Sequence, residues 1–414
     1  MPGVTKETID EASSRLSQVV GKFPLYFSDR LSQKFGAEIY LKREDLQVVR
    51  SFKIRGAYNK MSSLSDEERS RGVVCASAGN HAQGVAYSCK VLKIKGAIFM
   101  PEATPKQKVD KVKKHGGEYV EVVLLGETLD DALDGAWKYQ SENNAVFVHP
   151  FEDEMVISGQ GTIGKEIIEE LPDVDYVFSC VGGGGLISGT STYLKAVKPE
   201  VEIIGVEPFG SPGMVESLKE GKLTILDEID KFVDGAAMKK VGEKTFEIVK
   251  QKVKDVILVK EGKVATEMID LYQNEGIIAE PAGALSVAGL DFYKDEIKDK
   301  KVVCIISGGN NDLQRYPEIV ERSLRYKGLK HYFIINFTQK PGQLKAFLTE
   351  VLGPNDDIVR FEYIKKTNAE KGPAFIGIEH GSKDDYEPLL ERIKQVGFDY
   401  RVVGEDDLLY KYLV

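Results

Sequence analysis

Four successive glycines, Gly182 to Gly185, follow the apolar run "DYVFSCV" and precede a helix-like segment that starts at Leu186. Backbone N–H groups in such a loop can converge on an anion, and the helix N-terminus adds its dipole, so a phosphate is the natural ligand. The loop lacks the Gly-Lys-Ser/Thr of a P-loop and the third glycine of a dinucleotide fingerprint. Because Glu207 lies where a ribose-binding acid would lie, this loop alone leaves a nicotinamide enzyme, or a turn without a ligand, open.

Two further loops carry polar side chains. "SAGNHAQG" brings Ser77, Asn80 and His81 to the start of a helix, where they can bind a carboxylate or simply cap the helix. "SGGN" places Ser307 at the tip of "KVVCII", where a helix cap is again the alternative. His81 suggests a general base, although a single loop histidine is more often structural. None of the five histidines pairs with Cys or Glu at metal-ligand spacing, so no metal site is expected.

Lys53 lies behind Phe52 in "SFKIRGAYNK", followed by Arg55 and Gly56. Taken by itself, this lysine is a surface cation of a helix. Its amine becomes a nucleophile only where burial beside apolar groups keeps part of it neutral. Whether Lys53 does chemistry therefore depends on whether the polar loops converge on it.

The elements that must position these residues are short apolar runs separated by helix-period stretches. Segments such as "TPKQKVDKVKKHG", "TLDDALDGAWKYQSEN" and "GTIGKEIIEELP" have the helical period. The runs are "GVVCASAGN", "GAIFMPEAT", "YVEVVLLG", "AVFVHP", "DYVFSCVGGGG", "EIIGVEP", "VILVKEG" and "KVVCIISGGN". This alternation predicts an α/β fold with parallel sheets covered on both faces. Ligands of such folds bind where strands end and helices begin, which is where all three loops lie.

The pattern changes after about residue 325. "HYFIINFTQKPGQLKAFLTEVLG" predicts a strand, a Pro-Gly turn and a helix, and "DIVRFEYIKK" and "PAFIGIEH" predict two strands. "DYEPLLERIKQVG" predicts a second helix and "YRVV" a last strand. The order βαββαβ is typical of a small ferredoxin-like module. The basic stretch "ERSLRYKGLK" would connect it to the rest of the chain.

Composition excludes several classes of protein. With 414 residues, 42% hydrophobic and 29% charged, the chain predicts a globular protein of two or three domains. A net charge of −9 without a basic stripe argues against nucleic acid, and no apolar run is long enough for a membrane span. The N-terminus lacks a signal peptide, and the four cysteines show no CxxC spacing; three of them lie in or beside apolar strand-like runs and suit buried free thiols. We therefore expect a cytoplasmic protein.

Six motifs, in order along the chain, resemble those of the fold type II pyridoxal-phosphate enzymes, and most closely the biosynthetic threonine dehydratase (threonine deaminase) family. The motifs are "SFKIRGAYNK", "SAGNHAQGVA", "HPFEDEMVISGQGT", "VGGGGLISG", "AEPAGAL" and "SGGNND". The resemblance covers essentially the whole chain. It implies two parallel-sheet α/β subdomains in residues 1–324, the smaller at roughly 45–148, and an ACT-like regulatory domain in residues 325–414.

The same resemblance implies a role for each site residue. Lys53 would carry pyridoxal 5'-phosphate as a Schiff base and, once released by the substrate amine, remove the Cα proton. Phe52 would lie beside the ring, Asn80 would bind the ring hydroxyl, and Ser307 would face the pyridine nitrogen. The phosphate would be held by Gly182, Gly183, Gly184, Gly185 and Leu186. The substrate carboxylate would be held by Ser77, Ala78, Gly79, Asn80 and His81.

A serine at the pyridine nitrogen cannot keep that nitrogen protonated, which suits prompt β-elimination. The cofactor phosphate would then be the acid for the leaving hydroxyl. Departures from related families favour a dehydratase: Ala78 replaces the second serine of serine racemase, Phe151 also differs from the racemase pattern, and "FGSPG" lacks the aspartate of its divalent site. Asn80-His81 replaces the Asn-Thr of cysteine and threonine synthases.

The resemblance therefore implies conversion of L-threonine to 2-oxobutanoate and ammonia, the entry step to isoleucine. A catabolic L-serine/L-threonine dehydratase is the alternative. From another class, a non-catalytic amino-acid sensor is disfavoured because Lys53, Asn80, the four glycines and Ser307 are all intact. A nicotinamide enzyme has no use for Lys53. The ACT-like module implies a homotetramer and sensing of isoleucine or valine.

Overall fold

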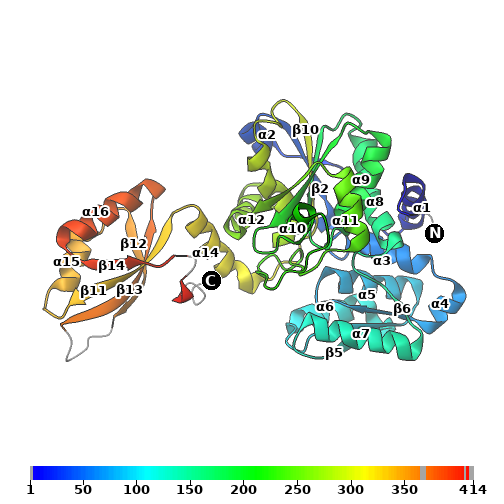
Figure 1. Cartoon of the computed structure of the whole chain (residues 1–414), viewed down its shortest axis with the longest axis horizontal. Helices are drawn as coiled ribbons and strands as arrows, with labels where there is room; N and C mark the ends of the chain where they lie inside the picture. Colours follow the sequence, from blue (N-terminus) through cyan, green and yellow to red (C-terminus); the bar gives the residue numbers. More distant parts are fainter. Residues whose placement is uncertain (1–2, 364–369, 405–406, 410–414) are drawn as a thin grey trace. The chain divides into compact units, whose positions relative to one another are not determined.

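The computed structural model describes the chain apart from residues 1–2, 364–369, 405–406 and 410–414. The chain divides into two compact units, residues 1–311 and 312–414 (Figure 1). The first unit contains two β-sheets and the second contains one. The expected division at residues 324/325 and the subdomain limits of 45–148 stay predictions.

The larger sheet of the first unit has the strand order β1-β2-β10-β7-β8-β9. All neighbours pair in parallel except β1, which is antiparallel to β2. Its last strand along the chain, β10, lies between β2 and β7. The strands are β1 (Tyr26–Phe27), β2 (Glu38–Arg43), β7 (Tyr176–Cys180), β8 (Glu202–Pro208), β9 (Asp255–Val259) and β10 (Lys301–Ile306).

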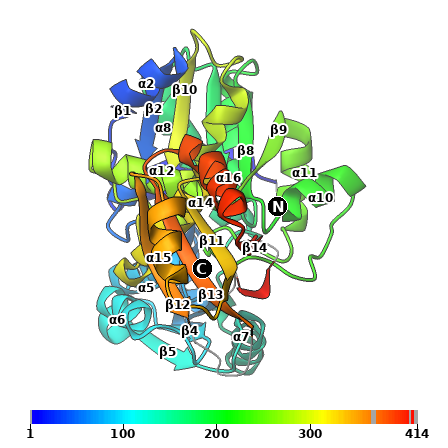
Figure 2. The ribbon, with the colours of Figure 1, turned by 90° about the vertical axis from the view of Figure 1, so that its left-hand side faces the viewer.

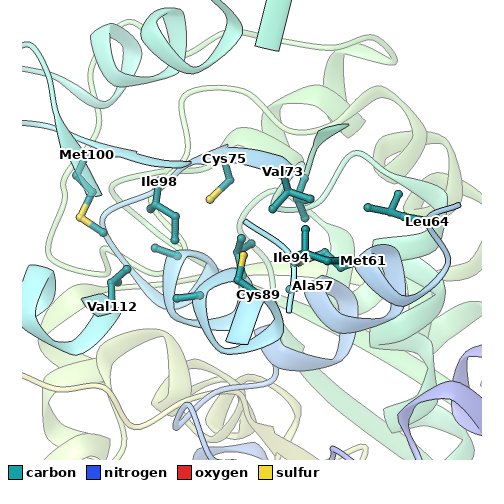
Figure 3. Close-up of a cluster of buried hydrophobic side chains, with 14 of the residues drawn as sticks. Ala57, Met61, Leu64, Val73, Cys75, Cys89, Ile94, Ile98, Met100 and Val112 are labelled. Carbon is teal, nitrogen blue, oxygen red and sulfur yellow. The ribbon is translucent and has the colours of Figure 1, made fainter. Parts of the chain in front are cut away.

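The smaller sheet is fully parallel, in the order β5-β4-β3-β6. Its strands are β3 (Val73–Ala76), β4 (Gly96–Met100), β5 (Val120–Leu124) and β6 (Val146–Phe147). One face packs against helices around Met61, Cys75, Cys89, Ile98 and Val112 (Figure 3). All four cysteines of the chain are buried and free, including the three for which apolar surroundings in the sequence predict it.

Helices lie between the strands of the first unit, many with side-chain caps. Thr128 and Asp131 form a capping box, and Asp153 accepts from two N–H groups of the next helix. The helices are α1 (Lys6–Leu16), α2 (Asp29–Phe35), α3 (Lys53–Ser62), α4 (Asp66–Arg71), α5 (Asn80–Leu92), α6 (Lys106–Gly116), α7 (Leu129–Asn143), α8 (Glu154–Glu170), α9 (Gly185–Val197), α10 (Gly213–Glu220), α11 (Glu243–Lys252), α12 (Glu261–Glu275) and α13 (Pro281–Ala288). Short 3-10 turns are η1 (Glu44–Leu46), η2 (Gly117–Tyr119) and η3 (Gly289–Tyr293).

The second unit is a four-stranded antiparallel sheet in the order β12-β13-β11-β14, with two helical segments on one face. Helix α16 and the segment after α15 lie side by side (Figure 2). The elements are η4 (Leu313–Arg315), α14 (Tyr316–Tyr326), β11 (Lys330–Thr338), α15 (Gln343–Ala346), η5 (Phe347–Val351), β12 (Asp356–Tyr363), β13 (Lys371–His380), η6 (Lys383–Asp385), α16 (Tyr386–Val396) and β14 (Asp399–Val402). The predicted βαββαβ order is confirmed.

Some boundaries differ from the prediction. The end of the second predicted strand, residues 364–366, lies outside the described residues. The basic stretch expected as a connection is largely helical, because α14 runs to Tyr326 and a turn at Gly328 follows. In the part of the chain that is described, no helix is long and apolar enough to cross a membrane.

Candidate active site

Lys53 is the first residue of α3, and its side chain is half-buried. Its Nζ donates a hydrogen bond to the Pro150 carbonyl oxygen at 2.9 Å and lies 5.2 Å from the centre of the Phe52 ring. Burial lowers the pKa of Lys53 to about 8, with the charges of Cys180 and Glu280 acting in the opposite direction. The amine is therefore neutral part of the time, as a nucleophile requires.

The backbone before Lys53 is joined to the loop after β10. Ser51 and Gly308 form an antiparallel bridge, and Phe52 N donates to the Ser307 carbonyl at 3.0 Å. The Ser307 hydroxyl is buried and donates to the Ala282 carbonyl at 3.2 Å. Residues from opposite ends of the first unit are thus side by side at the C-terminal edge of the larger sheet.

The four-glycine loop connects β7 to α9. In the described structure, none of the backbone N–H groups from Gly182 to Leu186 donates to a protein acceptor. Two positions of this loop require glycine. A Cβ at Gly183 would collide with the Phe151 ring, and Gly184 has a φ of +89°. Unpaired donors at a helix N-terminus form an anion site, and the close packing holds that site in shape.

His149 shapes the segment that joins Lys53 to the glycine loop. Its Nδ1 accepts from the backbone N–H groups of Phe151 and Glu152, at 3.2 and 2.8 Å. Burial lowers the pKa of His149 to about 4, so the ring is a neutral acceptor at neutral pH. The resulting turn directs the Pro150 carbonyl to Lys53 and sets Phe151 against Gly183. From the sequence alone His149 appeared only within a motif and received no role.

Asn80 begins α5 and lies in a polar cluster. Its Nδ2 donates to Glu280 Oε1 at 2.6 Å, and its Oδ1 accepts from Asn310 Nδ2 at 2.8 Å. Burial, together with the charge of Asp234, raises the pKa of Glu280 to about 7. Glu280 and Asn310 were absent from the sequence-based site. Only the fold brings them to Asn80.

The loop from Ser77 to His81 follows β3 and opens α5. The Gly79 N–H donates to Ser77 Oγ at 3.2 Å, and in the described residues the N–H groups of Asn80 and His81 have no protein acceptor. The His81 side chain is buried, and its Nε2 bonds to the Val148 carbonyl at 2.7 Å. Burial lowers the pKa of His81 to about 3, so the ring is neutral at neutral pH.

Arg55, two residues after Lys53, belongs to a buried ion network. The fully buried Arg55 guanidinium forms two-point contacts with Glu44 and Glu166, at 2.7 to 2.8 Å. Lys42 bonds to Glu166 at 2.8 Å from β2. This network ties α3 to η1 and α8 behind Lys53. A search of the described residues finds no group of three or more His, Cys, Asp or Glu that could hold a metal ion.

Comparison with known proteins agrees with this geometry. Residues 16–308 match the family "Pyridoxal-phosphate dependent enzyme", and residues 321–413 match "C-terminal regulatory domain of Threonine dehydratase". The chain belongs to the pyridoxal-phosphate-dependent enzymes, of fold type II, and within them to the threonine dehydratases with a C-terminal regulatory domain.

Individual relatives make that placement specific. The chain is 54% identical to the biosynthetic L-threonine dehydratase of Halalkalibacterium halodurans, over 99% of both chains. It is 53% identical to that of Bacillus subtilis, over 98% of this chain and 96% of the relative. A processed threonine deaminase of Solanum lycopersicum superposes with a TM-score of 0.74 at 41% identity, covering 77% of this chain and 92% of that one. Maize serine racemase has a TM-score of 0.73 at 32% identity, covering 78% and 99%.

The cofactor of this family is pyridoxal phosphate, and the residues present fit it. A partly neutral lysine amine and a loop of unpaired N–H groups are linked through Pro150 and Phe151. An amine for the aldehyde and donors for a phosphate are what this cofactor needs from a protein.

Proposed function

We propose that this protein dehydrates and deaminates L-threonine to 2-oxobutanoate and ammonia by α,β-elimination, the first step of isoleucine biosynthesis. The observation that carries the proposal is Lys53, whose partly neutral amine is held by the segment that packs on the glycine loop. Near-full-length relatives named biosynthetic L-threonine dehydratase support the choice of substrate.

The site residues divide into three groups. Lys53 would link to the cofactor aldehyde with Phe52 beside it, while Gly182 to Leu186 would bind its phosphate. Asn80 would donate to the ring oxygen, and Ser307 would face the ring nitrogen. The substrate carboxylate is bound by the loop of Ser77, Ala78, Gly79, Asn80 and His81, mainly through N–H groups at the start of α5.

Pyridoxal phosphate supplies the electron sink that makes the Cα–H bond of an amino acid acidic. Lys53 supplies the base, since its partly neutral Nζ can take the Cα proton. Its ordinary pKa would leave almost all of the amine protonated at neutral pH, and burial raises the neutral fraction by lowering that pKa to about 8. The buried Ser307 hydroxyl carries no negative charge, so it does not hold a proton on the ring nitrogen.

The alternative is a catabolic L-serine/L-threonine dehydratase. The match of residues 321–413 to a regulatory domain favours the biosynthetic enzyme. The test is to supply the purified protein with either amino acid and to measure the 2-oxo acid formed. Higher kcat/KM with threonine supports the proposal, a preference for serine supports the alternative, and no turnover of either contradicts both.

Regulation and assembly belong to the same proposal. We infer that isoleucine and valine act as effectors at the second unit, that the protein forms a homotetramer, and that it works in the cytoplasm. The regulatory-domain match supports the effectors. Sedimentation velocity of the holoenzyme tests the tetramer against a dimer.

A further inference from the structure

A polar cluster is formed by Asn80, Glu280 and Asn310. Most of its side-chain donors and acceptors already have a hydrogen-bond partner. Asn310 uses both N–H bonds of its Nδ2, one to the Val49 carbonyl and one to Asn80 Oδ1, each at 2.8 Å. Glu280 uses both oxygens, because Oε1 accepts from Asn80 Nδ2 and Oε2 accepts from Asn310 N at 3.2 Å. The amide orientation of Asn80 is therefore fixed, with its oxygen toward Asn310 and its nitrogen toward Glu280.

This orientation leaves the second N–H of Asn80 Nδ2 unused. Asn80 therefore has a free side-chain donor for a ligand. A donor suits a ring oxygen that has lost its proton, and an amide turned the other way would present its oxygen and repel that group. Glu280 and Asn310 together prevent the turn, since the alternative would set the amide oxygen against Glu280 Oε1 and the amide N–H groups against Asn310 Nδ2.

The backbone holds Glu280 in place. Its N–H donates to the Gly308 carbonyl at 3.1 Å, and a Cβ at Gly308 would collide with Glu280 Oε1. The side chain is only 5% exposed, and among the described residues it makes no ion pair with a lysine or arginine. A buried carboxyl without a cation is costly, so its presence at this site calls for a role.

Four charged or titratable groups interact electrostatically with Glu280. Asp234 raises the pKa of Glu280 and Lys108 lowers it. The charge of Glu280 in turn raises the pKa values of Lys53 and Cys180. The geometry agrees, because Glu280 Oε1 lies against Gly308, which forms a backbone bridge with Ser51, two residues before Lys53.

We propose that Glu280 is a positioning residue of this active site: with Asn310 it fixes Asn80 as a donor to the cofactor ring oxygen, and its negative charge favours the protonated form of the link between cofactor and Lys53. The proposal rests on the proposed function, since it assumes that the cofactor is bound through Lys53 next to Asn80.

The test is the visible absorption of the bound cofactor as a function of pH, with the cofactor dissociation constant measured separately. Glu280→Gln removes the charge, so the midpoint of the absorption change should move to lower pH by about one unit. Because a Gln side chain can also present its own N–H to Asn80, the cofactor should bind about tenfold more weakly. Asn310→Ala keeps the charge, so it should weaken binding and leave the midpoint in place.

Glu207→Gln is the matched control. Glu207 is a carboxyl as buried as Glu280, but it accepts from the N–H groups of Met214 and Val215 at the start of α10. This variant should keep the wild-type midpoint and affinity. A Glu280→Gln holoenzyme with both values unchanged would overturn the proposal. If Glu280→Gln does not fold, Asn310→Ala with wild-type affinity overturns the positioning role. A wild type without a visible band would instead contradict the proposed function.

Discussion

Lys53 is the residue on which the proposed chemistry depends, since it is both the covalent anchor and the base. Lys53→Ala removes the only amine at this position, so the purified protein should be colourless and turnover of threonine should be lost. Absorption spectra and 2-oxobutanoate formation measure the two effects. Lys113→Ala, which changes an exposed cation on α6, should keep the yellow colour. A coloured Lys53→Ala protein would show that another group holds the cofactor.

The pKa of Lys53 makes a second prediction at the residue scale. Because burial lowers that pKa to about 8, roughly a tenth of the amine is neutral one pH unit below it. The rate at which the cofactor-free protein takes up pyridoxal phosphate should therefore rise with pH and level off above about 8. Stopped-flow absorbance measures this rate. A rate still climbing steeply toward pH 10, as for an exposed lysine, would contradict the burial argument.

At this scale the sequence-based site contained the residues to which the family resemblance gave a role. Lys53, Asn80 and Ser307 are among them and stay predictions. Glu280 was missed although it lies in the motif "AEPAGAL", because it directly precedes Pro281, where an acid at the start of a helix is commonplace. Its partners are 200 and 30 residues away along the chain, and no local pattern records that approach.

At the scale of elements, the Phe151 ring packs against the four-glycine loop and limits which residues fit there. A methyl group at Gly183 would force the Phe151 ring and the loop apart, so Gly183→Ala should weaken cofactor binding by at least about tenfold. Fluorescence titration of the cofactor-free protein measures the affinity. The double variant Gly183→Ala, Phe151→Leu has more space at this contact and should recover part of the lost cofactor affinity. Wild-type cofactor affinity in Gly183→Ala alone would show that the loop can move away from Phe151 without loss of binding.

The buried ion network behind α3 should matter for stability. Arg55→Met leaves Glu44 buried without its partner, whereas Glu166 retains Lys42. The free energy of unfolding should fall by about 3–5 kcal/mol. Urea denaturation measures this change. Arg71→Met breaks an exposed pair with Glu67 and should change the same quantity by less than about 0.5 kcal/mol.

Strands were predicted correctly where the sequence pattern is continuously apolar. All eight apolar runs formed strands, because buried parallel strands are continuously hydrophobic. The strand β2 was missed because "EIYLKR" carries three charged residues. Lys42 is nonetheless fully buried. Its amine forms an ion pair with Glu166 and donates a hydrogen bond to the Phe23 carbonyl. A buried lysine looks exposed in a sequence until its acidic partner, more than a hundred residues away, is known.

At the scale of the whole molecule, a second compact unit follows the catalytic one. If it senses the end products, isoleucine or valine should change the threonine dependence of turnover in the full chain and leave a chain ending at Asn311 unaffected. Initial rates over a range of threonine concentrations, with each amino acid added in turn, measure this. An identical response of both chains would place any effector site in the catalytic unit, and no response of either would make the second unit purely structural.

The position of β10 has a consequence for how the protein is made. This strand is the last of the catalytic unit, yet it separates β2 from β7 in the larger sheet. A chain leaving the ribosome can complete the smaller sheet by Phe147, but until residue 306 emerges β2 and β7 lack their shared neighbour. The same late segment delivers Ser307 to the backbone beside Lys53. Cofactor capture must therefore wait for nearly the entire catalytic unit, and nascent chains stalled before β10 should depend on chaperones.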